Sequence, residues 1–181
     1  MRSSARVLVS VAMFALGAAA PASAQFAYLG GGLTIPLSTY GEYANTGYMV
    51  SGGLGMPLGD QGLSIVGEAF FGQNNHSDTE GDFTNPWGFM GGIEYDFAGA
   101  EATQSPYVFG GVGIFVHRYS SDQFESSSSS GLGLLGGAGY FFPLGVINGY
   151  VEGRLQHASI DSENTTFVGV IAGISIPLGS N

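Results

Sequence analysis

The sequence after residue 24 is poor in charged residues, yet it contains no apolar run that could cross a membrane as a helix. Hydrophobic residues make up 44% of the chain and charged residues only 10%, whereas about 25% charged residues is usual in globular proteins. A spanning helix needs about 18 or more consecutive apolar residues. The other structure that satisfies every backbone polar group within lipid is a closed β-barrel. The composition therefore favours an all-β fold that closes into a barrel.

The first 24 residues have the features of a secretion signal. Arg2 and Arg6 precede a short apolar stretch, and Ala22-Ser23-Ala24 fits the small-residue pattern of a cleavage site. We expect a signal peptide at 1–24, cleaved after export through the inner membrane, and a single barrel domain at 25–181.

Charge and cysteine content exclude several functions. Without the signal peptide, Arg118 and Arg154 are the only arginine or lysine residues, against 14 acidic residues, so a basic surface for nucleic acid is missing. The sequence has no cysteine, which excludes disulfides, thiol catalysis and zinc sites built on sulfur. His76, His117 and His157 lack the spacing of a metal site. We expect no metal and no cofactor.

Eight segments have strand character, and each has about the length needed to cross a bilayer at a tilt. Turn residues separate them, and apart from Pro21 every proline lies at or near a predicted strand end, where a missing N–H is tolerated. No helix is predicted after the signal peptide. The expected fold is an eight-stranded antiparallel transmembrane β-barrel, an up-and-down meander with strands near 26–37, 47–58, 63–73, 87–97, 107–118, 131–142, 149–159 and 166–177.

Residue alternation supports this assignment. In 48–58 and 87–97, large apolar residues occupy most of the alternate positions, and several of the intervening positions are glycine. Glycines recur in most strands, and we interpret them as relieving crowding inside a narrow barrel. Aromatic residues near the strand ends match the girdles of membrane barrels; they are Trp87, Tyr95, Phe97, Tyr107, Tyr140 and Phe142.

The connections alternate in length. The first, third, fifth and seventh are longer or more acidic than the second, fourth and sixth, as expected for external loops and periplasmic turns with both termini inside. Ser126 to Ser130 is a low-complexity segment that we expect to be mobile. Asp78, Glu80 and Asp82 alternate in one acidic loop and could bind Ca²⁺ or Mg²⁺, although a solvated negative loop is the simpler interpretation.

An interior polar network is predicted from the seventh strand. Glu152, Arg154 and Gln156 share one strand face, and Glu68 and Glu94 should also face the lumen. Buried carboxylates need a partner, and Arg154 is the cation available to them. We expect Glu68, Glu94, Glu152 and Arg154 to fill the lumen as a structural plug, with a gate or proton relay as the alternative.

The opening AYLGGGLTIPLSTYGEY, the central PYVFGGVGIF and the closing YVEGRLQHASIDSENTTFVGVIAGISIPL resemble the small outer-membrane β-barrel proteins of Gram-negative bacteria. This family includes OmpX-like, OmpA-transmembrane-like and opacity-like members. The resemblance implies an outer-membrane location, contact with lipid and lipopolysaccharide, and insertion by the outer-membrane assembly machinery. The family's last strand usually ends in an aromatic residue, whereas this chain ends in Ile176-Pro177-Leu178-Gly179-Ser180-Asn181.

His157 and Ser159 are the one enzyme-like signal. The pair is similar to the H-x-S motif of the lipid A deacylases, which are also eight-stranded barrels. The resemblance would make Ser159 the nucleophile and His157 the base, with Glu163 as the nearby acid. Ile160-Asp161 stands where that family has Asn-Ala, so the motif is found without its context.

The sequence therefore predicts a non-catalytic, monomeric outer-membrane barrel with a structural or surface-interaction role through acidic external loops. Two alternatives stay open. One is the lipid A deacylase, and the other is a soluble lipocalin-like carrier of an apolar ligand.

Overall fold

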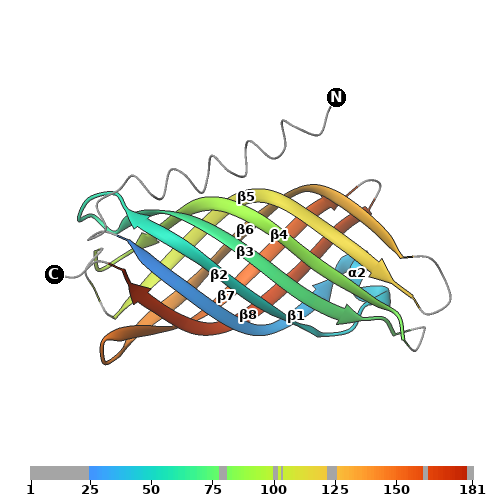
Figure 1. The fold of residues 1–181 in the computed structure, drawn as a ribbon, viewed down its shortest axis with the longest axis horizontal. Helices are drawn as coiled ribbons and strands as arrows, with labels where there is room; N and C mark the ends of the chain where they lie inside the picture. Colours follow the sequence, from blue (N-terminus) through green and yellow to red (C-terminus); the bar gives the residue numbers. More distant parts are fainter. Residues whose placement is uncertain are drawn as a thin grey trace.

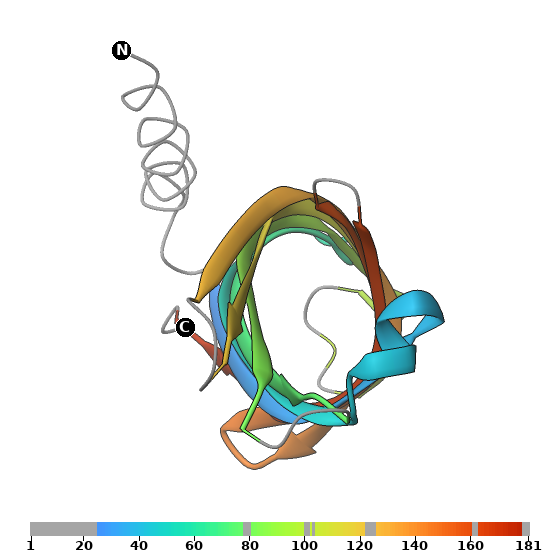
Figure 2. The same ribbon diagram turned by 90° about the vertical axis from the view of Figure 1, so that its right-hand side faces the viewer.

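The computed structural model describes residues 25–77, 81–99, 102, 104–121, 126–160 and 163–178. Eight strands form one closed antiparallel barrel in which each strand pairs with the next along the chain (Figures 1 and 2). The predicted fold class is confirmed. The predicted signal peptide at 1–24 lies outside the described residues. None of the helices in the described part of the chain has the length and apolarity to span a membrane.

The strands are at least as long as a bilayer crossing requires. Their bounds, together with one short helix, are β1 Phe26–Leu37, α2 Ser38–Tyr43, β2 Gly47–Pro57, β3 Leu63–Asn75, β4 Phe83–Asp96, β5 Ser105–Ser120, β6 Ser127–Leu144, β7 Ile147–Ile160 and β8 Glu163–Pro177. The predicted alternation of connection lengths is broken at the fourth connection, 97–104, which is longer than the third, 76–82, and the fifth, 121–126.

The barrel closes through a continuous ladder between the first and last strands. β1 pairs with β8 from Phe26 opposite Pro177 to Leu37 opposite Thr166. Both ends of the described chain therefore lie at one end of the barrel, which we call the terminus end (left in Figure 1). The turns after β2, β4 and β6 also lie there. The opposite end carries α2 and the connections after β3, β5 and β7, and we call it the α2 end.

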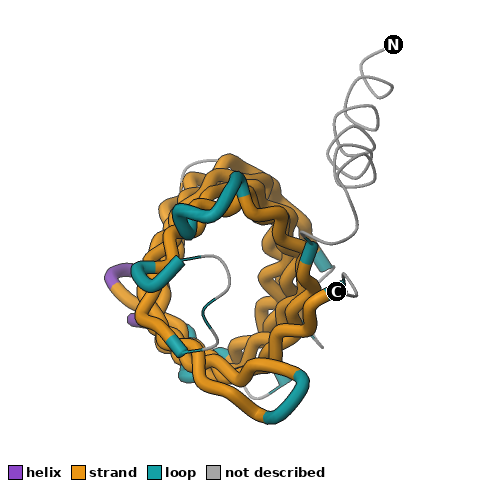
Figure 3. The backbone as a smooth tube through the Cα atoms, turned by 90° about the vertical axis from the view of Figure 1, so that its left-hand side faces the viewer, coloured by secondary structure: helices purple, strands orange, loops and turns teal. Residues whose placement is uncertain are grey.

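Side chains alternate strictly between the lumen and the outer surface. Along β7, Glu152, Arg154 and Gln156 are buried inside, while Val151 and Leu155 are exposed outside. Figure 3, which looks in from the terminus end, shows the strands as an unbroken wall around the lumen. The alternation exposes large apolar side chains on the outside of the barrel and places charged side chains within it, among apolar and aromatic residues of the core.

β4 begins four residues earlier than predicted, because a proline is accommodated inside the strand. Pro86 has no N–H to donate to Gly72 of β3, and the β3–β4 ladder is interrupted between Phe71–Trp87 and Asn74–Thr84. The side-chain amide of Asn85 donates to the Gly72 carbonyl at 3.1 Å instead. This substitute bond allows the strand to continue past the proline.

The serine-rich segment is also more ordered than predicted. Ser127 to Ser130 form the first residues of β6 and pair with Val116 to Tyr119 of β5. Backbone hydrogen bonds of a ladder do not depend on the side chain, so low complexity in the sequence did not prevent strand pairing. The expectation of a mobile segment was wrong for these four residues.

One short helix was not predicted. α2 occupies the first connection at the α2 end, where Figure 2 shows it on the rim of the barrel beside β8. It has no periodic apolar stripe, and its six residues bury only Tyr40. A single turn of this kind leaves no helical period in the sequence.

Candidate functional site

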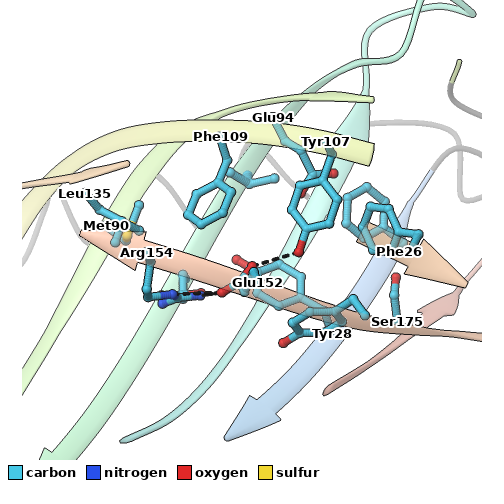
Figure 4. A pocket seen from close by; sticks show the side chains of 14 residues that line it. Phe26, Tyr28, Met90, Glu94, Tyr107, Phe109, Leu135, Glu152, Arg154 and Ser175 are labelled. Carbon is cyan, nitrogen blue, oxygen red and sulfur yellow. Dashed lines mark hydrogen bonds and ion pairs between the residues drawn. The ribbon is translucent and has the colours of Figure 1, made fainter. Parts of the chain in front are cut away.

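The centre of the lumen holds one arginine between two carboxylates (Figure 4). The Arg154 guanidinium from β7 donates to both carboxylate oxygens of Glu68 from β3, with Nη1–Oε1 at 2.7 Å and Nη2–Oε2 at 3.1 Å. Arg154 also donates to Glu152 Oε1, through Nε at 2.8 Å and through Nη2. All three side chains are at most 8% exposed. The structure thus brings Glu68, Glu152 and Arg154 into one buried ion-pair cluster.

Two aromatic residues of β5 complete this cluster. The Tyr107 hydroxyl donates to Glu152 Oε2 at 2.8 Å, and the Phe109 ring lies 5.6 Å from the Arg154 guanidinium carbon, within cation–π range. Tyr107 was predicted to lie in an aromatic girdle, and that was wrong. Residues of β5 with odd numbers face the lumen, so Tyr107 is 2% exposed and donates its hydroxyl hydrogen to an interior charge.

Glu94 lies at the edge of this arrangement. Its half-buried side chain lines the same cavity as Arg154, but among the described residues no hydrogen bond or ion pair to its carboxylate is found. Of the four residues predicted to form the interior network, three are directly bonded and the fourth is a neighbour.

The lumen is filled at this level. The cavity around Arg154 has a volume of about 30 Å³, which is close to the space that one water molecule occupies. On the terminus side of Arg154, Phe141 stacks on Tyr107 with ring centroids 4.3 Å apart. On the other side, Phe70 and Phe115 pack at 4.9 Å and are buried. The barrel is therefore a packed core and not an open channel.

The outer surface is apolar around the barrel. Nine large hydrophobic residues from five strands are each more than 50% exposed; they are Leu29, Leu33, Phe89, Ile93, Val112, Ile114, Leu132, Leu134 and Val170. Trp87, Tyr95 and Tyr140 are also exposed on this surface. Water-soluble proteins rarely expose an apolar area of this extent.

His157 and Ser159 are two positions apart and therefore lie on the same face of β7. This is the outer face, because from Tyr150 onward the buried residues of β7 are at the even-numbered positions. The His157 ring nitrogen Nδ1 is 2.8 Å from the Thr166 hydroxyl. Within the described part of the chain, no hydrogen bond joins His157 to Ser159. Glu163 belongs to β8, but its side chain is outside the described residues.

A second and larger cavity opens at the α2 end, and sequence reasoning did not predict it. This cavity, which we call the vestibule, has a volume of about 400 Å³. Its walls combine two residues of α2 with the ends of β4 to β8 and the bridge residue after β3. They are Tyr40, Tyr43, His76, Thr84, His117, Tyr119, Ser127, Ser129, Ile160 and Thr165. The sequence shows tyrosines and histidines in separate connections, and only the closed barrel brings them together.

Of the acidic loop residues predicted as a possible cation site, Asp78 and Glu80 lie outside the described residues. Asp82 is 5% exposed, accepts a hydrogen bond from the Tyr119 hydroxyl and, through its backbone carbonyl, accepts another from the His76 N–H. No group of three metal-binding side chains exists among the residues described. Asp82 therefore helps to shape the mouth of the barrel.

Comparisons with known proteins identify the fold. No protein-family profile matches the sequence, and no curated protein matches it. Among solved structures, Neisserial surface protein A superposes with a TM-score of 0.68 at 12% identity, over 84% of this chain and 96% of that chain. The attachment invasion locus protein Ail of Yersinia pestis superposes with a TM-score of 0.54 at 13% identity, over 85% and 99%.

A second structure of Ail, in complex with the heparin analogue sucrose octasulfate, superposes with a TM-score of 0.51 at 15% identity, over 84% and 99%. Identities this low concern the fold alone. At that level the predicted resemblance is confirmed, because the chain has the fold of small eight-stranded outer-membrane β-barrels.

Proposed function

We propose that this protein is an integral, non-catalytic β-barrel of a Gram-negative outer membrane, with a structural or surface-interaction role. The observation that carries the proposal is the inverted polarity of the barrel. Glu68, Glu152 and Arg154 are buried inside, while leucine, isoleucine, valine and phenylalanine side chains cover the outside. In water such a surface would aggregate, whereas in lipid it is the favourable arrangement.

The orientation follows from the two ends. In outer-membrane barrels both termini are periplasmic, and here both ends of the described chain lie at the terminus end. The α2 end would therefore face the outside of the cell, and the proposal includes a cleaved signal peptide at 1–24 and insertion by the assembly machinery. The acidic loops at this end would contact lipopolysaccharide through bridging divalent cations. We propose a monomer.

The α2 end of this chain lacks the clustered cations that would bind a polyanion such as the ligand in the Ail complex. Sucrose octasulfate is a polyanion, and a polyanion needs clustered cations. Here Arg154 is neutralised inside the lumen and Arg118 is the one arginine at the α2 end. We propose that the external surface does not bind heparin-like polyanions.

Fractionation of a Gram-negative host that expresses the full chain tests the location. The protein should sediment with the outer membrane, require detergent for extraction, and migrate faster on a gel before heating than after. Recovery in the soluble periplasm would contradict the proposal and favour the lipocalin-like alternative. That alternative needs an apolar lumen with a polar exterior, which is the reverse of the polarity of this barrel.

Mass spectrometry of lipid A tests the absence of catalysis. Lipid A from cells with and without the folded protein should be identical, because no hydrogen bond joins His157 to Ser159 and His157 contacts Thr166 instead. Loss of one 3-hydroxyacyl chain that disappears in the Ser159→Ala variant would make the protein a lipid A deacylase. The Ser121→Ala variant controls for loss of a serine at the same end of the barrel.

A further inference from the structure

The vestibule has the size of a small-molecule site and an unusual wall. Its volume of about 400 Å³ lies within the range of ligand pockets in proteins. Five of its lining residues are aromatic rings that contact one another in a continuous arc. The ring centroids are 6.0 Å apart for His117–Tyr40, 5.5 Å for Tyr40–Tyr43, 5.3 Å for Tyr43–His76 and 5.2 Å for His76–Tyr119. We call this set the aromatic arc.

Backbone contacts between connections hold the arc in place. The Ala44 and Asn45 N–H groups donate to Tyr40 and Asn75 carbonyls, and the Ser77 N–H donates to the Tyr43 carbonyl. His76 also forms an isolated bridge with Ala44, and its ring nitrogen Nε2 lies 2.8 Å from the Thr84 hydroxyl. A wall fixed in this way loses little conformational freedom when a ligand binds.

The charges around the vestibule favour a cationic ligand over an anionic one. The lining contains no lysine or arginine, and Arg118 points outward between the two lining residues His117 and Tyr119. The buried Asp82 carboxylate accepts the hydrogen bond of the Tyr119 hydroxyl and so places a negative charge next to one ring of the arc. This charge would repel an anion, and the lining has no lysine or arginine to offset the repulsion, whereas a cation would be stabilised.

From the arc, the cavity and the charge together, we propose that the vestibule binds a small organic cation with an alkylated ammonium head, of the choline type. Aromatic rings attract such heads through their electron-rich faces, and alkylated ammonium groups have a low cost of dehydration compared with metal ions. The inference goes beyond the proposed function and does not depend on it, because the folded barrel brings these lining residues together whichever membrane holds it.

Saturation-transfer NMR and calorimetry with choline test the proposal on the full barrel in a polyoxyethylene detergent, which carries neither sugar nor ammonium groups. The matched probe is 3,3-dimethylbutan-1-ol, which has the shape of choline but no charge. Choline should bind at least about ten-fold more tightly than this neutral probe. Equal affinity for the two compounds, binding of glucose in preference to choline, or no binding of choline at millimolar concentration would overturn the proposal.

Variants then locate the site. Tyr43→Leu should weaken choline binding about ten-fold, while Tyr43→Phe, which keeps the ring, should retain it. The control is Tyr48→Leu, because Tyr48 is near the same end of the barrel but 46% exposed on its outer face. Heat-dependent gel migration establishes that each variant is folded. Wild-type affinity in a folded Tyr43→Leu barrel, or equal losses in Tyr43→Leu and Tyr48→Leu, would contradict the assignment.

Discussion

At the scale of single residues, Arg154 organises the interior. Its guanidinium uses three nitrogens to contact Glu68 on β3 and Glu152 on β7, and Phe109 covers it. Planar, bidentate pairing of this kind suits arginine and not lysine. The cluster joins strands that are not neighbours in the sheet, since β3 and β7 face each other across the lumen.

Replacing Arg154 with alanine should destabilise the barrel by about 3 kcal/mol or more, because two carboxylates would be left buried without a counter-charge. Thermal unfolding in detergent, followed by heat-dependent gel migration, measures this. Arg118→Ala, which removes the other arginine at an exposed position, is the control and should leave the transition unchanged. An unchanged midpoint for Arg154→Ala would contradict the structural role of the cluster.

The sequence allowed these residues to be placed on one strand face, because alternation determines facing once the strand is known. It did not allow their partners to be predicted. Tyr107 was assigned to the outer surface because a tyrosine near a strand end is typical of an aromatic girdle. A tyrosine at such a position can equally face a polar lumen. The role of Tyr107 depends on which face β5 turns inward, and the composition of β5 leaves that choice open, since glycines occupy two positions on its inner face, Gly111 and Gly113.

At the scale of strands, glycines and aromatic rings pair across the ladder. Tyr107 is opposite Gly139 and Phe109 is opposite Gly137 in the β5–β6 register. A side chain at Gly137 would place its Cβ 2.6 Å from Phe109 Cζ. The rings therefore lie against bare backbone, which agrees with the prediction that glycines relieve crowding in a narrow lumen.

Gly137→Ala should destabilise the barrel by about 1–3 kcal/mol, since the added methyl group would clash with the Gly153 backbone carbonyl as well as with the Phe109 ring. Gly153→Ala is a close control. Gly153 lies on the adjacent β7 strand, and a Cβ there meets nothing within 4 Å. Unfolding midpoints of the two variants in detergent give the comparison, and equal midpoints would count against this packing account.

Strand positions were predictable from the sequence, and their ends were less so. The middle of each strand followed from apolar alternation, but β4 and β6 extend further toward the α2 end. The extensions depend on specific local bonds, such as the Asn85 amide that substitutes for the missing N–H of Pro86. The vestibule lies among these extended ends, which explains why its residues were not recognised as a group.

At the scale of the whole molecule, the barrel is packed across its centre and holds its charges inside. The cavity at Arg154 holds about 30 Å³, and aromatic pairs pack on both sides of it. Such a lumen offers no continuous path for hydrated ions.

Planar-bilayer recordings of the purified protein should therefore show no steady ionic conductance. A polar but packed interior differs in this respect from the water-filled lumen of larger barrels. Stepwise, long-lived currents that scale with protein concentration would mean that the interior opens in a bilayer, and the packed-core description would then be wrong.

The central claim is that the apolar outer face lies in lipid. Because the sequence has no cysteine, single spin labels can be placed cleanly in reconstituted vesicles. A label at Leu134→Cys, where the side chain is 58% exposed near the middle of β6, should collide with oxygen far more than with a water-soluble nickel chelate. A label at Gln61→Cys, exposed in the turn between β2 and β3, should show the opposite preference. Preferential collision of the Leu134→Cys label with the nickel chelate would place this face in water and contradict the account.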